Sequence, residues 1–272
     1  IALGHDARII DPRLVAPYRS QGRAGKNDIN DAIAICEAAG RPQMRFVPIK
    51  TVEQQAILVV HRLRRAAVAS RTRNINRMRG LIAEFGIVLP KGAENFKRQW
   101  RELRAAPPPA VPLLVWQVLD PMFAQLDDFH QEVLGFDRMI HGFVKDDERA
   151  VRLMQLAGIG PTTASALVAT IGNGRDFKNG RQFAAWVGLT PRQYSTGGQP
   201  RLGAITKRGD SYLRTLLVHG ARAVLGRVDQ RDDRVARWAK NLLQTKSWNR
   251  AAVALANKNA RIAWALLAQP TH

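Results

Sequence analysis

The sequence has 272 residues, with 42 lysines and arginines against 22 acidic residues, which gives a formal net charge of +20. So large an excess favours a polyanionic partner, of which nucleic acid is the usual one, and predicts a cytoplasmic, nucleoid-associated protein. A membrane surface is the second candidate partner, but no apolar stretch reaches the roughly 18 residues of a membrane-spanning helix, and the single cysteine excludes an internal disulfide.

The first 50 residues combine two short strand-like segments with a helix. Ala7–Ile10 and Met44–Ile49 carry the apolar residues of short strands, and Asp28–Ala39 has helical periodicity up to Gly40. A single buried strand at the start of the chain cannot form a sheet by itself. We therefore expect this region to be the last part of an α/β domain whose other strands precede Ile1.

Two carboxylates lie in the first turn of the predicted helix. Asp28 and Asp31 are three residues apart, so they share one helix face. Such a pair can hold Mg²⁺, which takes further oxygen ligands from water and phosphate. Acidic residues at a helix start also cap it and interact favourably with its dipole, and the residues alone favour this structural role. A nuclease site would need further carboxylates from elsewhere.

A long amphipathic helix is predicted from Val52 to Phe85. Between His61 and Ala83 it contains no acidic residue, and arginines occupy its other faces. Because like charges four residues apart destabilise a helix, an unrelieved arginine face is better explained by contact with phosphates. The arginines expected to bind nucleic acid are Arg62, Arg65, Arg73 and Arg77.

Further helices are predicted along the rest of the chain. One runs from about residue 113 to 144 and would pair with the preceding long helix as an antiparallel hairpin or coiled coil. The amphipathic segments Asp210–Leu225 and Arg250–Leu267 are typical of core-forming helices. The sequence thus predicts a mainly α protein with domains at residues 1–50, 51–148 and 149–272.

The segment Arg149–Gly172 has the pattern of a helix, a glycine turn and a second helix. Leu156-Ala-Gly-Ile-Gly-Pro161 is the turn, and proline suits the first position of a helix. Free N–H groups at such a turn bind phosphate without sequence preference, as in the helix-hairpin-helix motif of non-specific DNA binding. A plain helical hairpin has the same pattern. The residues expected to bind are Gly158, Gly160, Thr162 and Thr163.

Residues 188–214 place two hydroxyls beside two glycines and many cations. Glycine lets the backbone approach a phosphate closely, and Ser195 or Thr196 could attack a phosphodiester as an activated hydroxyl. Ser195 is favoured because its primary hydroxyl is less hindered. A glycine-rich surface loop with solvated charges is the alternative. The expected phosphate contacts are Arg192, Thr196, Gly197, Arg201, Lys207, Arg208 and Arg214.

Several short motifs, taken in order, resemble the DEDD-type insertion-sequence transposases of the IS110 and IS1111 branches, the second more closely. Each motif is short, but together they extend over nearly the whole chain in a specific order. Among them are Lys26-Asn-Asp-Ile-Asn-Asp-Ala32, Gly158-Ile-Gly-Pro161, Ala185-Trp-Val-Gly-Leu189, Ser195-Thr-Gly-Gly198 and Ile205-Thr-Lys-Arg-Gly209.

The resemblance implies an architecture. A RuvC-like, ribonuclease-H-fold domain would carry Asp, Glu, Asp and Asp around Mg²⁺, with Asp28 and Asp31 matching the last two and the first two lying before Ile1. A coiled-coil hairpin would follow, then an α-helical transposase domain with a helix-hairpin-helix and a serine, matching Ser195, that forms a covalent link to DNA. A structured guide RNA would pair with target and donor DNA. A composite site, with carboxylates brought from another subunit or domain, would need at least a homodimer.

Three functions remain open from the sequence. The first is a transposase that cuts and rejoins DNA through a serine-linked intermediate, and the resemblance favours it. The second is a metal-dependent nuclease or junction resolvase, in which water attacks and Ser195 only binds phosphate. The third is a non-catalytic DNA- or RNA-binding protein, with Asp28 and Asp31 as helix caps.

Overall fold

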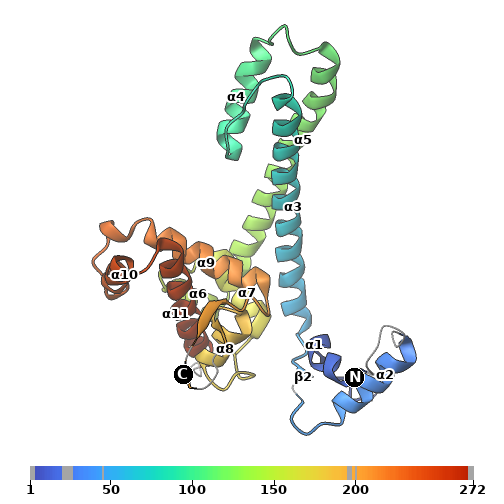
Figure 1. Ribbon diagram of the computed structural model, residues 1–272, viewed down its shortest axis with the longest axis vertical. Coiled ribbons are helices and arrows are strands. Elements are labelled where there is room, and N and C mark those ends of the chain that lie inside the picture. Colours follow the sequence, from blue (N-terminus) through green and yellow to red (C-terminus); the bar gives the residue numbers. More distant parts are fainter. Residues whose placement is uncertain (1–3, 20–26, 45, 195–197, 200, 269–272) are drawn as a thin grey trace. The chain divides into compact units, whose positions relative to one another are not determined.

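The computed structural model describes residues 4–19, 27–44, 46–194, 198–199 and 201–268. The chain is mainly helical, as predicted, and divides into two compact units, Ile1–Thr51 and Val52–His272 (Figure 1). No helix in the described part of the chain is long and apolar enough to cross a membrane.

The first unit is small and has few buried residues. Its core consists of Val15, Ala34 and Ala38. We expected a buried strand at its start, but the strand is two residues long, pairs with a later strand, and leaves Ile9 52% exposed. The elements are β1 (Ile9–Ile10), α1 (Pro12–Val15), the 3-10 helix η1 (Ala16–Tyr18), α2 (Asp28–Ala39) and β2 (Phe46–Val47), with β1 and β2 antiparallel.

The second unit begins with a long antiparallel pair of helices, α3 (Val52–Ala83) and α5 (Leu113–Lys145), which lie side by side in Figure 1. Their direction follows from contacts that run in opposite order along the two helices. Arg64 pairs with Asp137, while further along α3 Asn74 donates to the Met122 carbonyl at 2.7 Å. The predicted pair of long helices is thus present.

A separate aromatic core holds the far end of this helix pair together. The helix α4 (Ala93–Ala105) lies there, and its Trp100 stacks on Phe123 and meets Trp116 edge-on. Lys97, whose side chain is 8% exposed, reaches Asp127 of α5 at 2.7 Å. The far end therefore has its own packing and ion pairing.

The C-terminal part of the unit forms the main hydrophobic core. Helix α7 is buried on almost every face and packs against both α3 and α5, so the base of the helix pair is continuous with this core. The elements are α6 (Glu148–Met154), α7 (Pro161–Ile171), α8 (Gly180–Val187), β3 (Pro191–Gln193), β4 (Leu202–Ile205), α9 (Ser211–Leu225), the 3-10 helix η3 (Val228–Gln230), α10 (Arg234–Thr245) and α11 (Trp248–Ala268).

Aspartate caps and alanines explain how these short helices form and pack. Asp147, Asp210 and Asp233 each accept hydrogen bonds from two N–H groups at the start of α6, α9 and α10. Helix α11 lies against α8 and α9 with a face of fully buried alanines, which lets the backbones approach closely. We predicted an α-helical domain with a glycine-rich loop between its helices, and two short antiparallel strands, β3 and β4, lie in that loop region.

Candidate functional site

The predicted nucleophile belongs to the connection of a β-hairpin formed by β3 and β4. Beyond the strands the pairing continues, because the Tyr194 N–H donates to the Arg201 carbonyl at 2.8 Å. Nearly all side chains of the two strands are exposed. Residues 195–197, which are Ser195, Thr196 and Gly197, lie outside the described residues, so their roles stay predictions.

Two glycines fix the root of this hairpin to the end of α8. Gly188 and Gly209 both have a φ of +82°, which favours glycine. A Cβ on Gly209 would lie 1.7 Å from the Trp186 carbonyl oxygen, and one on Gly188 would lie 2.1 Å from the Arg208 carbonyl oxygen. The chain entering the hairpin and the chain leaving it are therefore held together, backbone against backbone.

Arg214 adds side-chain hydrogen bonds to these backbone contacts. Its Nη1 donates to the Val187 carbonyl at 2.8 Å and to the Arg208 carbonyl at 3.2 Å. The sequence predicted Arg214 as a phosphate contact, but this nitrogen is committed to main-chain carbonyls, which makes Arg214 a positioning residue for the hairpin. The other cations predicted around the loop are exposed: Arg192, Arg201, Lys207 and Arg208.

A buried histidine connects the hairpin root to the long helix pair. His61 of α3 is 1% exposed, and its Nδ1 and Nε2 lie 2.9 Å from the hydroxyls of Tyr212 on α9 and Ser165 on α7. Burial lowers the pKa of His61 to about 4; the charge of Arg64 acts in the same direction, and that of Asp137 opposes it. The neutral ring donates one hydrogen bond and accepts the other.

Sequence reasoning found no functional signal for His61 beyond its position. It lies fourteen residues before the buried Ile75, on the same side of α3, but no second histidine or cysteine stands at a ligand spacing from it. Its partners Ser165 and Tyr212 are 104 and 151 residues away in sequence. Only the fold brings the three together.

The predicted phosphate-binding turn is built into the core. Gly158 has a φ of +90° and packs against α9, where a Cβ on Gly220 would lie 1.8 Å from the Gly158 carbonyl oxygen. Thr163 is 6% exposed and its N–H donates to the Gly160 carbonyl at 3.0 Å. The Thr163 side chain is buried and its N–H is used within the fold, and its contact with nucleic acid stays an untested prediction. Gly160 is exposed and Thr162 half-buried, and their roles stay predictions.

The arginines of α3 fall into two groups. Arg64, Arg71 and Arg79 are half-buried and donate to groups of α5 or of the chain that follows α3. The remaining four are exposed and have no ion-pair partner among the described residues. At 3.6 residues per turn they share about one third of the helix circumference. These four are the predicted set: Arg62, Arg65, Arg73 and Arg77.

Asp28 and Asp31 lie in the first turn of α2. Neither caps the helix, because the Asn27 side chain accepts from the Asn30 N–H at 2.8 Å. The Asp31 carboxylate is instead ion-paired with Arg19 at 2.9 Å, and Asp28 is exposed. Within the described ranges, no group of three or more His, Cys, Asp or Glu side chains could hold a metal ion. The role of Asp28 and Asp31 as Mg²⁺ ligands stays a prediction, in which water and phosphate would supply the other ligands.

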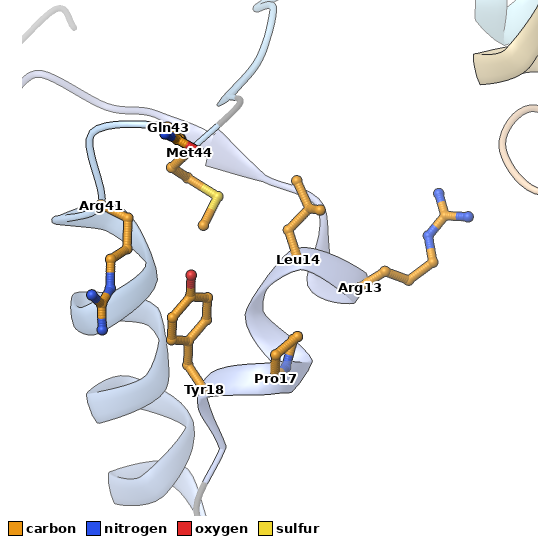
Figure 2. Close-up of a pocket in the computed structure, with 7 residues that line it drawn as sticks. All are labelled: Arg13, Leu14, Pro17, Tyr18, Arg41, Gln43 and Met44. Carbon is orange, nitrogen blue, oxygen red and sulfur yellow. The ribbon is translucent and has the colours of Figure 1, made fainter. Parts of the chain in front are cut away.

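The first unit also contains a pocket of about 440 Å³, lined by α1, η1 and the turn after α2. Figure 2 shows Tyr18 and Arg41 on one side of it, with Leu14 and Met44 nearby; the guanidinium lies 5.4 Å from the ring centroid. Arg41 is already paired with Glu37 at 2.5 Å. Arg13, the other cation of the pocket, is paired with Asp11 at 2.6 Å. Because both cations are neutralised and no predicted site residue lines the pocket, we assign it no ligand.

Comparison with known proteins places the chain among transposases. The model of the transposase IS116/IS110/IS902 family matches residues 150–237, and a second transposase model matches residues 2–87. These two ranges include the glycine turn, the hairpin and the Asp28 helix.

Individual relatives are similar over almost the whole chain. A probable family 20 transposase of Pseudomonas aeruginosa is 47% identical over 270 residues, which cover 99% of this chain and 79% of that protein. The transposase for insertion sequence element IS1328 of Yersinia enterocolitica is 41% identical, with 99% and 79% covered. The transposase for insertion sequence element IS1111A of Coxiella burnetii is 39% identical, with 98% and 72% covered.

These matches confirm the resemblance that the ordered motifs indicated. Two transposase family models match the N-terminal and C-terminal parts of the chain, and the relatives are similar to it along nearly its whole length. The chain therefore belongs to the IS110/IS116 family of insertion-sequence transposases and is a DNA transposase, an enzyme.

Proposed function

We propose that this transposase cuts and rejoins DNA through the hydroxyl of Ser195, with Thr196 as the alternative nucleophile. The serine oxygen forms a bond to phosphorus, the bond from phosphorus to the leaving strand breaks, and the serine proton ends on the leaving strand's hydroxyl. Rejoining is the reverse reaction with a different strand hydroxyl, so the energy of the phosphodiester is kept in the serine ester.

The observation that carries this proposal is the anchored hairpin. Its root is held by the Gly188 and Gly209 backbone contacts and by the Arg214 guanidinium, while its strands carry no core residues. A hairpin that is held firmly at its root and whose strands are exposed suits a nucleophile that must reach the backbone of a bulky duplex. The exposed Arg192 and Lys207 would bind the phosphate on which charge develops.

Asp28 and Asp31 are the proposed holders of Mg²⁺. When bound, the ion would supply Lewis acidity and neutralise charge on the phosphate. The two side chains share one face of α2, and Asp31 would exchange its Arg19 partner for the metal. Because Arg19 competes, we expect weak metal binding in the absence of nucleic acid.

The partners follow from charge and from family resemblance. A net charge of +20 and the exposed arginines of α3 support binding to DNA over several phosphates. We further propose a structured guide RNA and a homo-oligomer as partners. Base pairing of the RNA, rather than protein side chains, would then select the target.

The test is detection of a covalent protein–DNA adduct. The protein is incubated with Mg²⁺, RNA transcribed from the element's end and a nicked DNA that traps the intermediate, and the products are separated on a denaturing gel. We expect a DNA-linked protein band that is lost in Ser195→Ala and kept in Thr196→Ala. Cleaved DNA without an adduct, equal in wild type and Ser195→Ala, would instead identify a nuclease in which water attacks.

A further inference from the structure

A groove of about 680 Å³ lies in the C-terminal part of the chain, outside every predicted site. It is lined by the first turn of α8 and by residues of α10 and α11. Its walls combine two indole rings, Trp238 and Trp264, with three cations, Arg181, Lys258 and Arg261. No acidic residue is among the described residues that line it.

The groove has fixed walls. A Cβ on Gly180 would lie 2.8 Å from the Arg261 carbonyl oxygen, so the start of α8 touches α11 backbone to backbone. The Trp264 indole is held in place because its Nε1 donates to the Gly174 carbonyl at 2.9 Å. Trp238 is half-buried on the facing helix α10. An occupant would therefore meet a prepared surface rather than one that must be ordered first.

The cations of this groove are not neutralised by neighbouring carboxylates. Arg181, Lys258 and Arg261 form no ion pair with any described residue. The Lys258 ammonium instead lies 4.2 Å from the centroid of the Trp238 ring. Three like charges around one cavity repel one another, and an anionic occupant would relieve that repulsion.

We propose that this groove binds an unpaired stretch of nucleic acid, with one base stacked on Trp238 and the flanking phosphates on Arg181 and Arg261. The Lys258 ammonium covers one face of the Trp238 ring, and its flexible stem would let it move to a phosphate and leave that face to a base. A base inside a duplex has both faces covered by its neighbours, so only an unpaired base can stack on the indole. The carboxylates of an acidic peptide would satisfy the cations but would leave the Trp238 ring without a stacking partner.

The groove is connected to the hairpin root. Asn257, which lines it, donates to the Leu189 carbonyl at 3.3 Å, two residues before β3 begins. A strand engaged at the hairpin could thus continue into the groove. Binding there needs no strand cleavage, so its test is independent of the proposed role of Ser195.

A pair of charge reversals with a matched control tests the proposal. Fluorescence anisotropy gives the Kd of labelled single-stranded DNA, single-stranded RNA and duplex DNA of one length at one salt concentration. Arg181→Glu/Arg261→Glu alters the groove, and Arg234→Glu/Arg237→Glu makes the same charge change on exposed arginines of α10 outside it. We expect the groove pair to weaken single-strand binding about tenfold more than the control, with equal effects on duplex.

Equal weakening of single-strand binding by both pairs would overturn the proposal. So would displacement of single-stranded DNA by polyglutamate as readily as by unlabelled strand of equal charge, which would indicate an acidic protein as the occupant. Tighter binding of the RNA or of the DNA strand identifies which nucleic acid the groove prefers, and either result supports an unpaired strand.

A second pair of variants tests the stacking. Trp238→Ala should weaken single-strand binding about tenfold, while Trp238→Phe keeps an aromatic face and most of the affinity. An oligonucleotide with iodouracil should cross-link to the peptide that carries Trp238 in the wild-type protein and not in Trp238→Ala. If Trp238→Ala does not fold, the cross-link in the wild-type protein and the charge-reversal variants still test whether the groove binds an unpaired strand. A cross-link confined to other peptides would contradict the assigned site.

Discussion

His61 shows how a single buried side chain makes the stability of this protein depend on pH. Its pKa falls from an ordinary value of 6.5 to about 4 in the folded chain, because burial disfavours the charged ring. The unfolded chain therefore binds a proton first as the pH falls. The part of the free energy of unfolding that is linked to His61 is fully present above about pH 6.5. It falls by roughly 3 kcal/mol in total as the pH is lowered from there to pH 4. Most of this loss occurs at a higher pH than the protonation of the carboxylates.

The prediction is a steeper acid dependence of unfolding in wild type than in His61→Gln. Urea unfolding followed by circular dichroism across this pH window measures it. Glutamine keeps a donor and an acceptor for Tyr212 and Ser165, so His61→Gln should fold with a loss of about 1–3 kcal/mol near neutral pH. The exposed His219, changed to Gln, is the control and should keep the wild-type slope. An unchanged slope in His61→Gln would contradict the assignment.

At the scale of elements, α3 combines two functions on different faces. One face packs against α5 and α7 and uses arginines as hydrogen-bond donors within the fold, as Arg64 does to Asp137. The other carries the four exposed arginines that pair with no described carboxylate, among them Arg62, Arg73 and Arg77. A rigid helix keeps such charges at fixed spacing, which suits the regularly spaced phosphates of a nucleic acid backbone.

The second prediction concerns the salt dependence of DNA binding. Arg62→Gln/Arg73→Gln/Arg77→Gln should lower the slope of log affinity against log salt by about 0.9 for each phosphate that the variant no longer neutralises. Affinity should fall alike for unrelated sequences, because phosphate contacts do not read bases. Anisotropy titrations over a range of salt concentrations measure both. The control is a triple change of other exposed arginines, Arg227, Arg234 and Arg237, and an equal reduction of the slope there would contradict a specific role for α3.

The elements differ in how far the sequence could predict them. The long helices were predictable because their apolar spacing is sustained, and α2 has the predicted bounds Asp28–Ala39. The hairpin was not, because its strands have three and four residues and are exposed on both faces, which leaves no apolar alternation to detect. The four arginines of α3 that the sequence predicted to bind nucleic acid are exposed, and their binding stays a prediction. The sequence could not distinguish Arg214 from these cations, because its carbonyl partners depend on the fold.

The same limit applies to the groove beside α11. Its three cations come from positions up to 80 residues apart, and each alone is an ordinary surface residue of an amphipathic helix. Trp238 and Trp264 have the helical spacing of core residues, and both do pack on the core. What distinguishes the site is a cavity whose described lining residues include cations and no carboxylate, and that is a property of the tertiary structure.

At the scale of the whole molecule, the proposed chemistry divides between the two units. The carboxylates Asp28 and Asp31 belong to the unit Ile1–Thr51, and the hairpin with Ser195 belongs to Val52–His272. A strong positive charge spread over the chain opposes self-association unless nucleic acid neutralises it. We therefore expect oligomers to form on DNA or RNA rather than in its absence, with carboxylates and hydroxyl supplied by different subunits.

Complementation between inactive variants tests this arrangement. Asp28→Ala and Ser195→Ala should each be inactive alone, and a mixture should form joined DNA, because a mixed assembly can contain one site with an intact carboxylate pair and an intact hydroxyl. The matched control is a mixture of Asp28→Ala with Asp31→Ala, which lack members of the same pair and should stay inactive. Joined DNA is measured on a sequencing gel. The mixtures and each variant alone are compared at the same total protein concentration. If the first mixture is as inactive as the control while both proteins still bind DNA, the carboxylates and the hydroxyl of one subunit must act together.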